Sequence, residues 1–412
     1  MAQAQASHLP MDSSKRRLED VDFTEITFEE QLTLLRDLDF SPWIAHAFVG
    51  KGKGGGCIYE VNHASTGHNA AVKWPARRED RDVLQAINEK SGGCIGVPEL
   101  HDHGSFDGDL YVVMDLLGTP LTDVFHKLQD LSLQSRWKMV CVIGRMMLRR
   151  LEAMHHHGFL HCDINPGNIL VGLAQGNGDE CHKLYLVDFG SARVHPGGSP
   201  VKPDWGSVDF NSIRSGDGGV LQPSDDLESL GWVLLHGLYD ELPWFSICEK
   251  ADWKNKEARL ATAKQVQLEK INFLEHGGAE CDGHLKRIRK TPPSLIEFLR
   301  LCSGQQQDTS DGGHADVPDY RTLASLLGAK PDITEEMAEQ ADVASLRFFC
   351  TYGRLMDEEG SALSPNASIQ PDSSALAGLQ EAESPPGTPK GNDGLFDFGS
   401  LDTAEQAAAS GK

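Results

Sequence analysis

The chain has 412 residues, and its 38 Lys and Arg against 61 Asp and Glu give a formal net charge of −23. A balance this acidic argues against general charge-driven binding to nucleic acid or to an anionic membrane. No apolar stretch is long enough for a bilayer, the N-terminus has no signal-like apolar core, and the 9 cysteines show no CxxC spacing. We therefore expect an intracellular soluble protein, cytoplasmic, nuclear or both, with reduced thiols.

Composition divides the first four fifths of the chain into three segments. Residues 1–40 form a flexible polar extension, in which the capping-box pattern Thr27–Glu30 predicts a short helix. Residues 41–117 hold short alternating runs between glycines, which is typical of β-strands. Residues 118–328 show apolar spacings of three and four, which predict helices.

The C-terminal part predicts one helix followed by a tail. Residues 329–356 have helical periodicity. The expected apolar face comprises Met337, Ala341, Ala344 and Phe348. Residues 357–412 are rich in Ser, Pro and acidic residues without apolar periodicity, so we expect this acidic tail to be disordered. Its apolar cluster Leu395–Phe398 is a candidate docking motif for partners, and equally a patch without a partner.

A glycine-rich run follows a strand-like segment near the start of the β-rich part. Gly50, Gly52 and Gly55 have the spacing GxGxxG, and glycines let backbone N–H groups approach phosphates closely. Such a run is also typical of a plain flexible loop. No GK[ST] closes it, which excludes a Walker A loop, and Ile58–Val61 continues as a strand rather than a dinucleotide-binding helix.

A lysine at the end of the next strand-like run supports phosphate binding. Lys73 closes the run Ala-Ala-Val-Lys, and a lysine beneath a glycine hairpin can reach the α and β phosphates of ATP. Asp80 lies on the edge of the apolar face of the following helix and is the expected ion-pair partner of Lys73. Glu79 and Asp82 remain alternatives.

A second group of residues has the spacing of a phosphoryl-transfer site. The run from His161 to Asn168 reads HxDxxxxN, which lets Asp163 orient a hydroxyl nucleophile and Asn168 bind Mg²⁺ through its amide oxygen. Asp188 follows an apolar strand in Asp-Phe-Gly and is the second expected Mg²⁺ ligand, because Mg²⁺ prefers oxygen donors. The neighbouring histidines His155–His157 lack an acid at helical spacing, so we expect solvated or capping side chains.

These motifs resemble the protein kinases, and more narrowly the casein kinase I and vaccinia-related kinase group, over residues 43–328. Met114–Phe125 is similar to the hinge of that group, and Gly206–Ile213 to its P+1 segment. Asp225–Leu234 resembles its helix F, and Pro318–Leu323 the closing motif of its catalytic domain.

The resemblance implies an α+β, bilobal protein-kinase fold with a β-rich N-lobe, a helical C-lobe and ATP in the cleft. By position, the implied nucleotide-binding residues are Val49, Gly50, Lys51, Gly52, Gly55, Cys57, Ala71, Lys73, Met114, Asp115, Leu117 and Leu170. Val49, Cys57, Ala71 and Leu170 would enclose the adenine, Met114 would be the gatekeeper, and the backbone at Asp115 and Leu117 would bind the base. Asp226 would brace the catalytic loop.

The implied catalytic residues are Asp163, Lys73, Asn165 and Ser207, with Asn168 and Asp188 as the metal ligands. Four positions depart from the pattern of the group. Cys162 replaces an arginine that binds an activation-loop phosphate, Asn165 replaces a lysine, Asp80 replaces a glutamate, and Asp209 replaces an arginine of the P+1 segment. The habitual preference of the group for acidic substrates is therefore not transferred to this chain.

The resulting hypothesis is an ATP- and Mg-dependent serine/threonine kinase that acts on protein substrates. One alternative is a pseudokinase scaffold, which Cys162, Asn165 and Asp80 favour. Another is a small-molecule kinase of the aminoglycoside or choline type, whose loop resembles His161–Asn168, although the helix F and P+1 motifs argue against it.

Overall fold

The computed structural model describes residues 34–52, 56–90, 93–173, 182–278, 291–304 and 319–355. All of them belong to one compact unit, residues 1–379. The expected helix at Thr27–Glu30, Gly55 of the glycine run and the acidic tail lie outside the described residues. Among the described helices, none is both long and apolar enough to cross a membrane.

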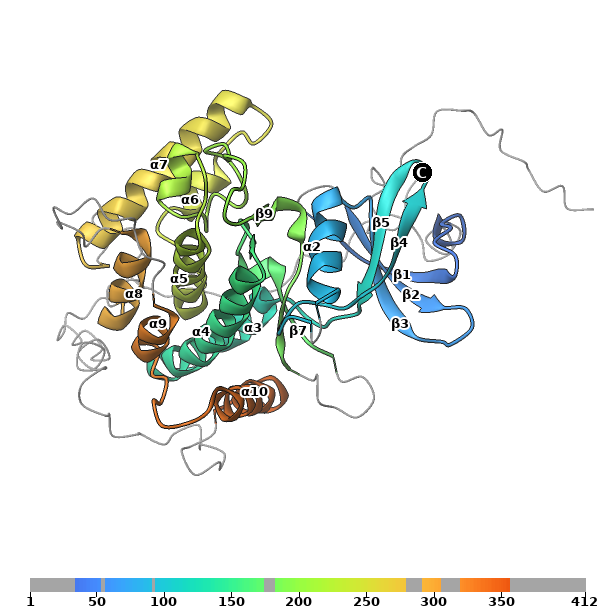
Figure 1. Cartoon of the computed structure of the whole chain (residues 1–412). Helices are drawn as coiled ribbons and strands as arrows, with labels where there is room; N and C mark the ends of the chain where they lie inside the picture. Colours follow the sequence, from blue (N-terminus) through green and yellow to red (C-terminus); the bar gives the residue numbers. More distant parts are fainter. Residues whose placement is uncertain are drawn as a thin grey trace, which may run out of the picture. The chain divides into compact units, whose positions relative to one another are not determined.

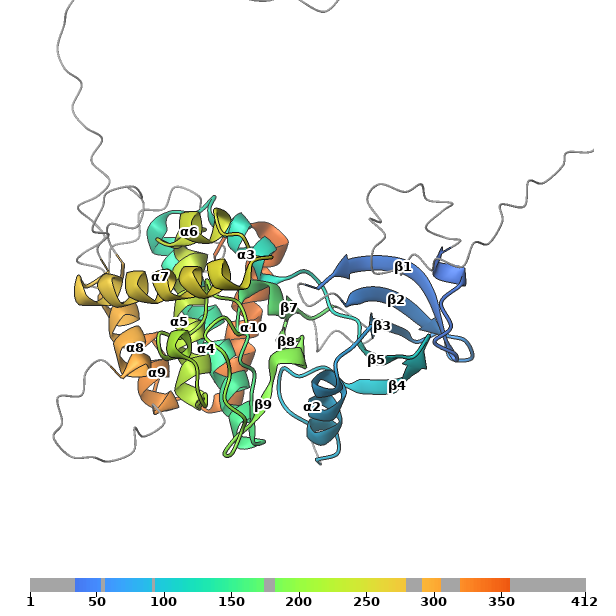
Figure 2. The ribbon, with the colours of Figure 1, turned by 90° about the horizontal axis from the view of Figure 1, so that it is seen from above.

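The N-lobe is a five-stranded antiparallel sheet with the strand order β1-β2-β3-β5-β4. Its strands are β1 (Trp43–Lys51), β2 (Cys57–His63), β3 (Asn69–Trp74), β4 (Leu100–Phe106) and β5 (Asp109–Asp115). Helix α2 (Arg78–Asn88) packs against β4 and β5. Figures 1 and 2 show this sheet and α2 on one side of the helical part of the unit.

The alternation of side chains along β3 decides what faces the cleft. Ala70, Val72 and Trp74 enter one apolar cluster on the sheet face away from the cleft. Because successive side chains point to opposite faces, Ala71 and Lys73 lie on the other face, towards α2 and the C-lobe. The strand is therefore buried on both faces, and its lysine is presented inside the molecule.

The C-lobe is built around α4 (Leu133–His156) and α5 (Pro223–Tyr239), which pack against each other. The other helices before residue 328 are α3 (Leu121–Leu128), α6 (Phe245–Glu249), α7 (Lys256–Glu275), α8 (Pro293–Ser303) and α9 (Tyr320–Leu326). Trp232 of α5 and Trp244 are fully buried and meet edge to face, with ring centroids 5.1 Å apart. This aromatic packing fixes the position of α5, which lies next to the loops described below.

Short strands and turns carry those loops. The strands are β6 (Phe159–Leu160), β7 (Ile169–Val171), β8 (Leu184–Leu186) and β9 (Arg193–Val194), with single turns η2 (Pro166–Asn168) and η3 (Phe189–Ser191). β6 pairs with β9 and β7 with β8, both antiparallel. The β-rich N-lobe and helical C-lobe of the expected fold are both present.

Helix α10 (Glu335–Tyr352) agrees with the predicted C-terminal helix but buries a different face. Met337, Ala341 and Ala344 are exposed, and the buried residues of α10 are Asp342, Val343, Leu346 and Phe349. The expected apolar face was therefore wrong.

Arginines of α4 explain this choice of face. Glu339 contacts Arg149 and Arg150 at 2.7 and 2.6 Å, and Asp342 contacts Arg145 and Arg149 at 2.5 and 2.7 Å. Arg150 is completely buried, so its charge requires a partner inside the molecule. Binding these three arginines places the acidic side of α10 inward, together with the apolar residues that flank it.

Candidate active site

Lys73 binds two carboxylates that come from opposite sides of the cleft. Its ammonium lies 2.8 Å from Asp80 of α2 and 2.7 Å from Asp188, which follows β8. Burial lowers the pKa of Lys73, but the two carboxylates outweigh burial and the pKa is raised. Burial likewise raises the pKa of Asp188, and the charge of Lys73 outweighs it, so that this pKa is lowered. Both groups are thus charged at neutral pH.

Of the three acids considered, Asp80 is the one that pairs with Lys73. The same carboxylate accepts the backbone N–H of Arg77 at 3.0 Å, so it also caps the first turn of α2. Glu79 and Asp82 are exposed. Asp80 therefore contributes both to the start of α2 and to the position of Lys73.

The expected adenine-binding residues lie on the cleft face of the sheet, with one correction. Ala71 and Met114 are direct cross-strand neighbours on this face. Cys57 pairs with Trp74 and joins the apolar cluster on the opposite face, whereas Ile58 pairs with Lys73 and packs on the cleft side. The assignment of Cys57 was therefore wrong by one residue, because the glycine run obscures the alternation of β2.

The other expected adenine contacts come from three segments. Val49 at the end of β1 is exposed, and Leu170 of β7 is half-buried between the buried Ile169 and Val171. Leu117 is half-buried after β5. None of these three residues is among those that line the cavity described below.

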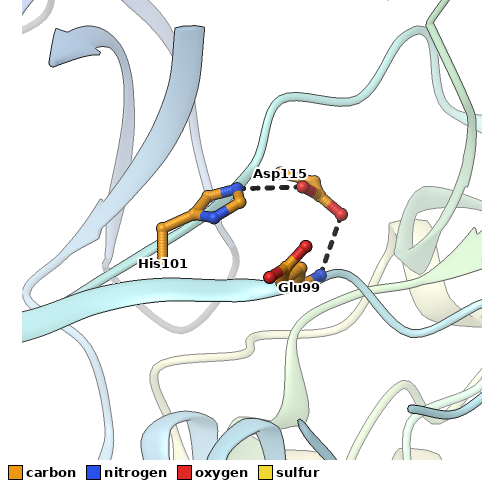
Figure 3. A group of neighbouring side chains, drawn as sticks. All are labelled: Glu99, His101 and Asp115. Carbon is orange, nitrogen blue, oxygen red and sulfur yellow. Dashed lines mark hydrogen bonds and ion pairs between the residues drawn. The ribbon is translucent and has the colours of Figure 1, made fainter. Parts of the chain in front are cut away.

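Asp115, at the end of β5, is fixed by Glu99, just before β4, and by His101 of β4. Its carboxylate accepts the backbone N–H of Glu99 at 2.8 Å and lies 2.9 Å from Nε2 of His101, as Figure 3 shows. The hydrogen bond to Asp115 raises the pKa of His101, which strengthens the pair. The backbone N–H of Asp115 donates to Glu99, so only its carbonyl oxygen stays a candidate for the adenine.

Glu99, His101 and Asp115 also offer ligand atoms within 4.8 Å of one another. Both oxygens of Asp115 are already engaged by hydrogen bonds, and Glu99 is exposed. The group is therefore explained as a brace that orients the segment after β5, and we assign no metal to it.

The catalytic-loop residues converge on Asp163. Its carboxylate accepts the backbone N–H of Ser207 at 2.9 Å and the side-chain amides of Asn165 and Asn168 at 3.2 Å each. Asn165 also donates to the hydroxyl of Ser207 at 3.2 Å. Three residues from two segments thus fix the orientation of one carboxylate. Because the amide nitrogen of Asn168 donates to Asp163, its amide oxygen can serve as a metal ligand.

Asp226 of α5 holds the loop from below. Its two oxygens accept the backbone N–H groups of His161 and Cys162 at 2.8 Å each, and one oxygen also lies 2.9 Å from His155. Burial raises the pKa of Asp226, but the hydrogen bond and charge of His155 outweigh it and the pKa is lowered. Cys162 has φ +61°, so this loop adopts a left-handed conformation beside Asp163.

His155 corrects the expectation for the three adjacent histidines. The rings of His156 and His157 contact carbonyl groups of their own helix, as capping side chains do. His155 instead has a buried side chain that bridges Asp226 and the hydroxyl of Tyr320. Helical spacing within the sequence does not reveal a partner 71 residues away.

The segment after Ser207 is anchored by a buried lysine that the sequence did not single out. Lys270 of α7 donates to the carbonyl groups of Val208 and Asn211 at 3.1 and 2.5 Å. Its ammonium lies 5.2 Å from the ring of Trp244. Burial lowers the pKa of Lys270. No local motif marks such a contact, since it joins α7 to a segment that lies 59 to 62 residues earlier in the chain.

A cavity of about 430 Å³ joins these groups. It is lined from the glycine run by Lys51, Gly52 and Gly56, from the N-lobe by Lys73 and Arg77, and from the C-lobe by Asp163, Asn165, Asn168, Asp188 and Ser207. Carboxylate and amide oxygens lie on one wall and cations on the other, which suits phosphate groups with Mg²⁺. We call it the phosphate cavity.

Comparison with known proteins agrees with this geometry. The family model of the protein kinase domain matches residues 43–308. The chain is also 28% identical over 296 residues to a probable casein kinase I homolog of Encephalitozoon cuniculi, which covers 67% of this chain and 81% of that protein. With its β-rich N-lobe, helical C-lobe and these motifs, the chain belongs to the protein kinase superfamily and is casein kinase I-like.

Proposed function

We propose that this protein is a serine/threonine protein kinase that uses ATP and Mg²⁺. The observation that carries the proposal is the position of Asp163, whose carboxylate is fixed by Asn165, Asn168 and Ser207 at the wall of the phosphate cavity. A carboxylate at this place can orient a substrate hydroxyl and accept its proton. Nothing in the arrangement needs a covalent enzyme intermediate.

Residues of both lobes would take part in phosphoryl transfer. Lys73 supplies a positive charge for the α and β phosphates, and its position is set by Asp80 and Asp188. The hydroxyl oxygen of a protein Ser or Thr would bond to the γ-phosphorus while the bond to the ADP oxygen breaks, and Asp163 would receive the hydroxyl proton. Asn168 and Asp188 would hold Mg²⁺, which neutralises phosphate charge when bound.

Retained geometry supports an enzyme over a pseudokinase scaffold. Asn165 stands where the related kinases have a lysine, and its amide still joins Asp163 to Ser207. Asp80 reaches Lys73 despite its shorter side chain. The family match to protein kinases supports protein acceptors over small molecules.

Phosphorylation of a peptide library with Mg·ATP tests this proposal. We expect phosphate on Ser and Thr in the wild type and a loss of at least about a hundredfold in turnover for Asp163→Asn. The substitution preserves shape, so Mg·ATP binding should persist. Equal turnover of wild type and Asp163→Asn would refute the enzyme, and acceptance of amino sugars or choline instead of peptides would refute the substrate class.

A further inference from the structure

Arg77 lies where the phosphate cavity meets a second cavity. The second one, of about 880 Å³, is lined by residues between Lys202 and Asp209 and by residues of α6 and α7, and we call it the acceptor groove. Five residues line both cavities: Arg77, Asp204, Trp205, Gly206 and Ser207. Arg77 is the one cation among these shared residues. A phosphoryl group that leaves a nucleotide for an acceptor must cross this boundary.

The side chain of Arg77 is held at this boundary by Asp-Phe-Gly. Its Nη1 donates to the carbonyl of Gly190 at 3.2 Å. A Cβ at position 190 would lie 2.9 Å from Cδ of Arg77 and 3.3 Å from a carboxylate oxygen of Asp188. The arginine therefore crosses directly over Gly190, beside Asp188, in space that a glycine leaves open.

The charge of Arg77 is not neutralised by an acid within the described ranges. Lys73 shares its ammonium between Asp80 and Asp188, and Asp204 pairs with Arg259 at 3.1 Å. Arg77 makes one hydrogen bond to a neutral carbonyl, so most of its five N–H donors are left for a ligand. A planar guanidinium of this kind fits a phosphoryl group through paired hydrogen bonds.

Asn165 explains why a cation is needed at this boundary. Its neutral amide lies against Asp163 and Ser207 and brings no positive charge to the γ-phosphate. Phosphoryl transfer spreads negative charge over three oxygens, and a cation aimed at them stabilises the transition state.

We propose that Arg77 is a further catalytic residue, which binds the γ-phosphoryl group of ATP during transfer. This inference rests on the proposed kinase function and extends it to a residue at the start of α2. The same guanidinium could instead bind a phosphate already present on a substrate, and the experiment separates the two sources.

Nucleotide binding to the full chain gives the first test. Affinities of a non-hydrolysable Mg·ATP analogue and of Mg·ADP are compared in wild type, Arg77→Ala, Arg77→Lys and the matched control Arg78→Ala, because Arg78 lines neither cavity. We expect Arg77→Ala to weaken the ATP analogue about tenfold more than ADP, Arg77→Lys to retain part of this preference, and Arg78→Ala to change neither. If Arg77→Ala lost equal affinity for both nucleotides, the role of Arg77 would be structural and the proposal would be overturned. The proposal would also be overturned if Arg77→Lys lost as much affinity for the ATP analogue as Arg77→Ala.

Turnover with two matched peptides gives the second test. We expect Arg77→Ala to lower kcat about a hundredfold on an unphosphorylated peptide, with the peptide KM nearly unchanged. A defect confined to a peptide that already carries a phosphate would overturn the proposal and show that Arg77 binds the phosphate of the substrate. Thermal melting checks that each variant is folded. If Arg77→Ala does not fold, the kinetics of Arg77→Lys decide the test in its place. If the wild type shows no turnover, the kinase function fails, while the ATP and ADP affinities still decide the role of Arg77.

Discussion

The carboxylate of Asp80 has two structural roles in this site. Both of its oxygens contact the ammonium of Lys73, at 2.9 and 2.8 Å, and one of them also accepts the backbone N–H of Arg77. The same carboxylate thus connects Lys73 to Arg77, the residue just before α2 that lines the phosphate cavity. A shorter acid at the start of a helix can therefore serve where the related kinases use a glutamate.

We expect Asp80→Asn to weaken Mg·ATP binding about tenfold while the chain stays folded. The amide oxygen can still cap α2, but Lys73 loses one of two charged partners, and about 3 kcal/mol is an upper limit for that loss because Asp188 remains. Calorimetric titration with Mg·ATP measures the affinity. The control is Asp82→Asn on the exposed side of α2, and equal affinities for Asp80→Asn and wild type would contradict the assignment.

At the same scale, the sequence predicts residues whose geometry is local and misses those whose partners are distant. Asp163 and Asn168 share one loop, so their spacing already brings them together. Cys57 was assigned to the wrong face because glycines interrupt the alternation from which a strand is read. His155 gains its role from a residue of α5, and Arg77 from Gly190, and no spacing rule reports either contact.

At the scale of elements, α7 positions the segment that would contact the acceptor. Lys270 is buried and donates to the carbonyls of Val208 and Asn211, on either side of the turn that follows Ser207. The indole of Trp244 donates to the carbonyl of Asp209 between them, at 2.8 Å. Three backbone carbonyls of this segment are thus held by the side chains of Lys270 and Trp244.

We expect Lys270→Met to raise the peptide KM severalfold and to leave Mg·ATP affinity nearly unchanged. Methionine fills similar space but leaves two carbonyl groups without their donor, which costs about 1–3 kcal/mol per unsatisfied group and loosens the segment. Steady-state kinetics with varied peptide and varied ATP separate the two effects. Lys264→Met, at an exposed position of the same helix, is the control, and a purely nucleotide-dependent defect in Lys270→Met would contradict this role.

Helix α10 shows why an element can be predicted while its buried face cannot. Its periodicity is plain in the sequence, but apolar residues lie on more than one face, and the buried ones are Val343, Leu346 and Phe349. The arginines of α4, about 190 residues earlier, select the face that carries Glu339 and Asp342. Burial raises the pKa of Glu339, but the hydrogen bond and charge of Arg150, with Arg149, outweigh it and the pKa is lowered.

We expect Glu339→Gln to lower the free energy of unfolding by about 3 kcal/mol at pH 7, because it leaves the buried Arg150 without its charge partner. Since the folded pKa of Glu339 lies below its ordinary value of 4.5, the stabilisation is present above that pH and lost as pH falls through the folded pKa. Denaturant unfolding of both proteins should therefore converge on acidification. Glu336→Gln on the exposed face of α10 is the control, and a difference that stays constant with pH would contradict the ion pair.

At the scale of the whole unit, polar contacts join the two lobes around the phosphate cavity. Lys73 reaches Asp188, Arg77 reaches Gly190, and the backbone N–H of Leu186 donates to the carbonyl of Gly96. All three contacts reach the segment that carries Asp-Phe-Gly. A ligand that binds this segment therefore acts on both lobes, and its binding free energy adds to the stability of the fold.

We expect saturating Mg·ATP to raise the melting temperature of the wild type and to have little effect on Asp188→Asn. At a hundred times the dissociation constant the ligand adds about 2.7 kcal/mol to the free energy of unfolding. Asp188→Asn removes both an expected metal ligand and a charged partner of Lys73, so the nucleotide loses its attachment to the C-lobe. Differential scanning fluorimetry over a series of ATP concentrations, with Mg²⁺ and then with excess EDTA, measures the shift.

Because Asp188 contacts both lobes, the melting temperature of each protein with ATP is compared with that of the same protein without ligand. A shift that survives in Asp188→Asn, or in EDTA, would show that the nucleotide binds without the metal site proposed at Asn168 and Asp188.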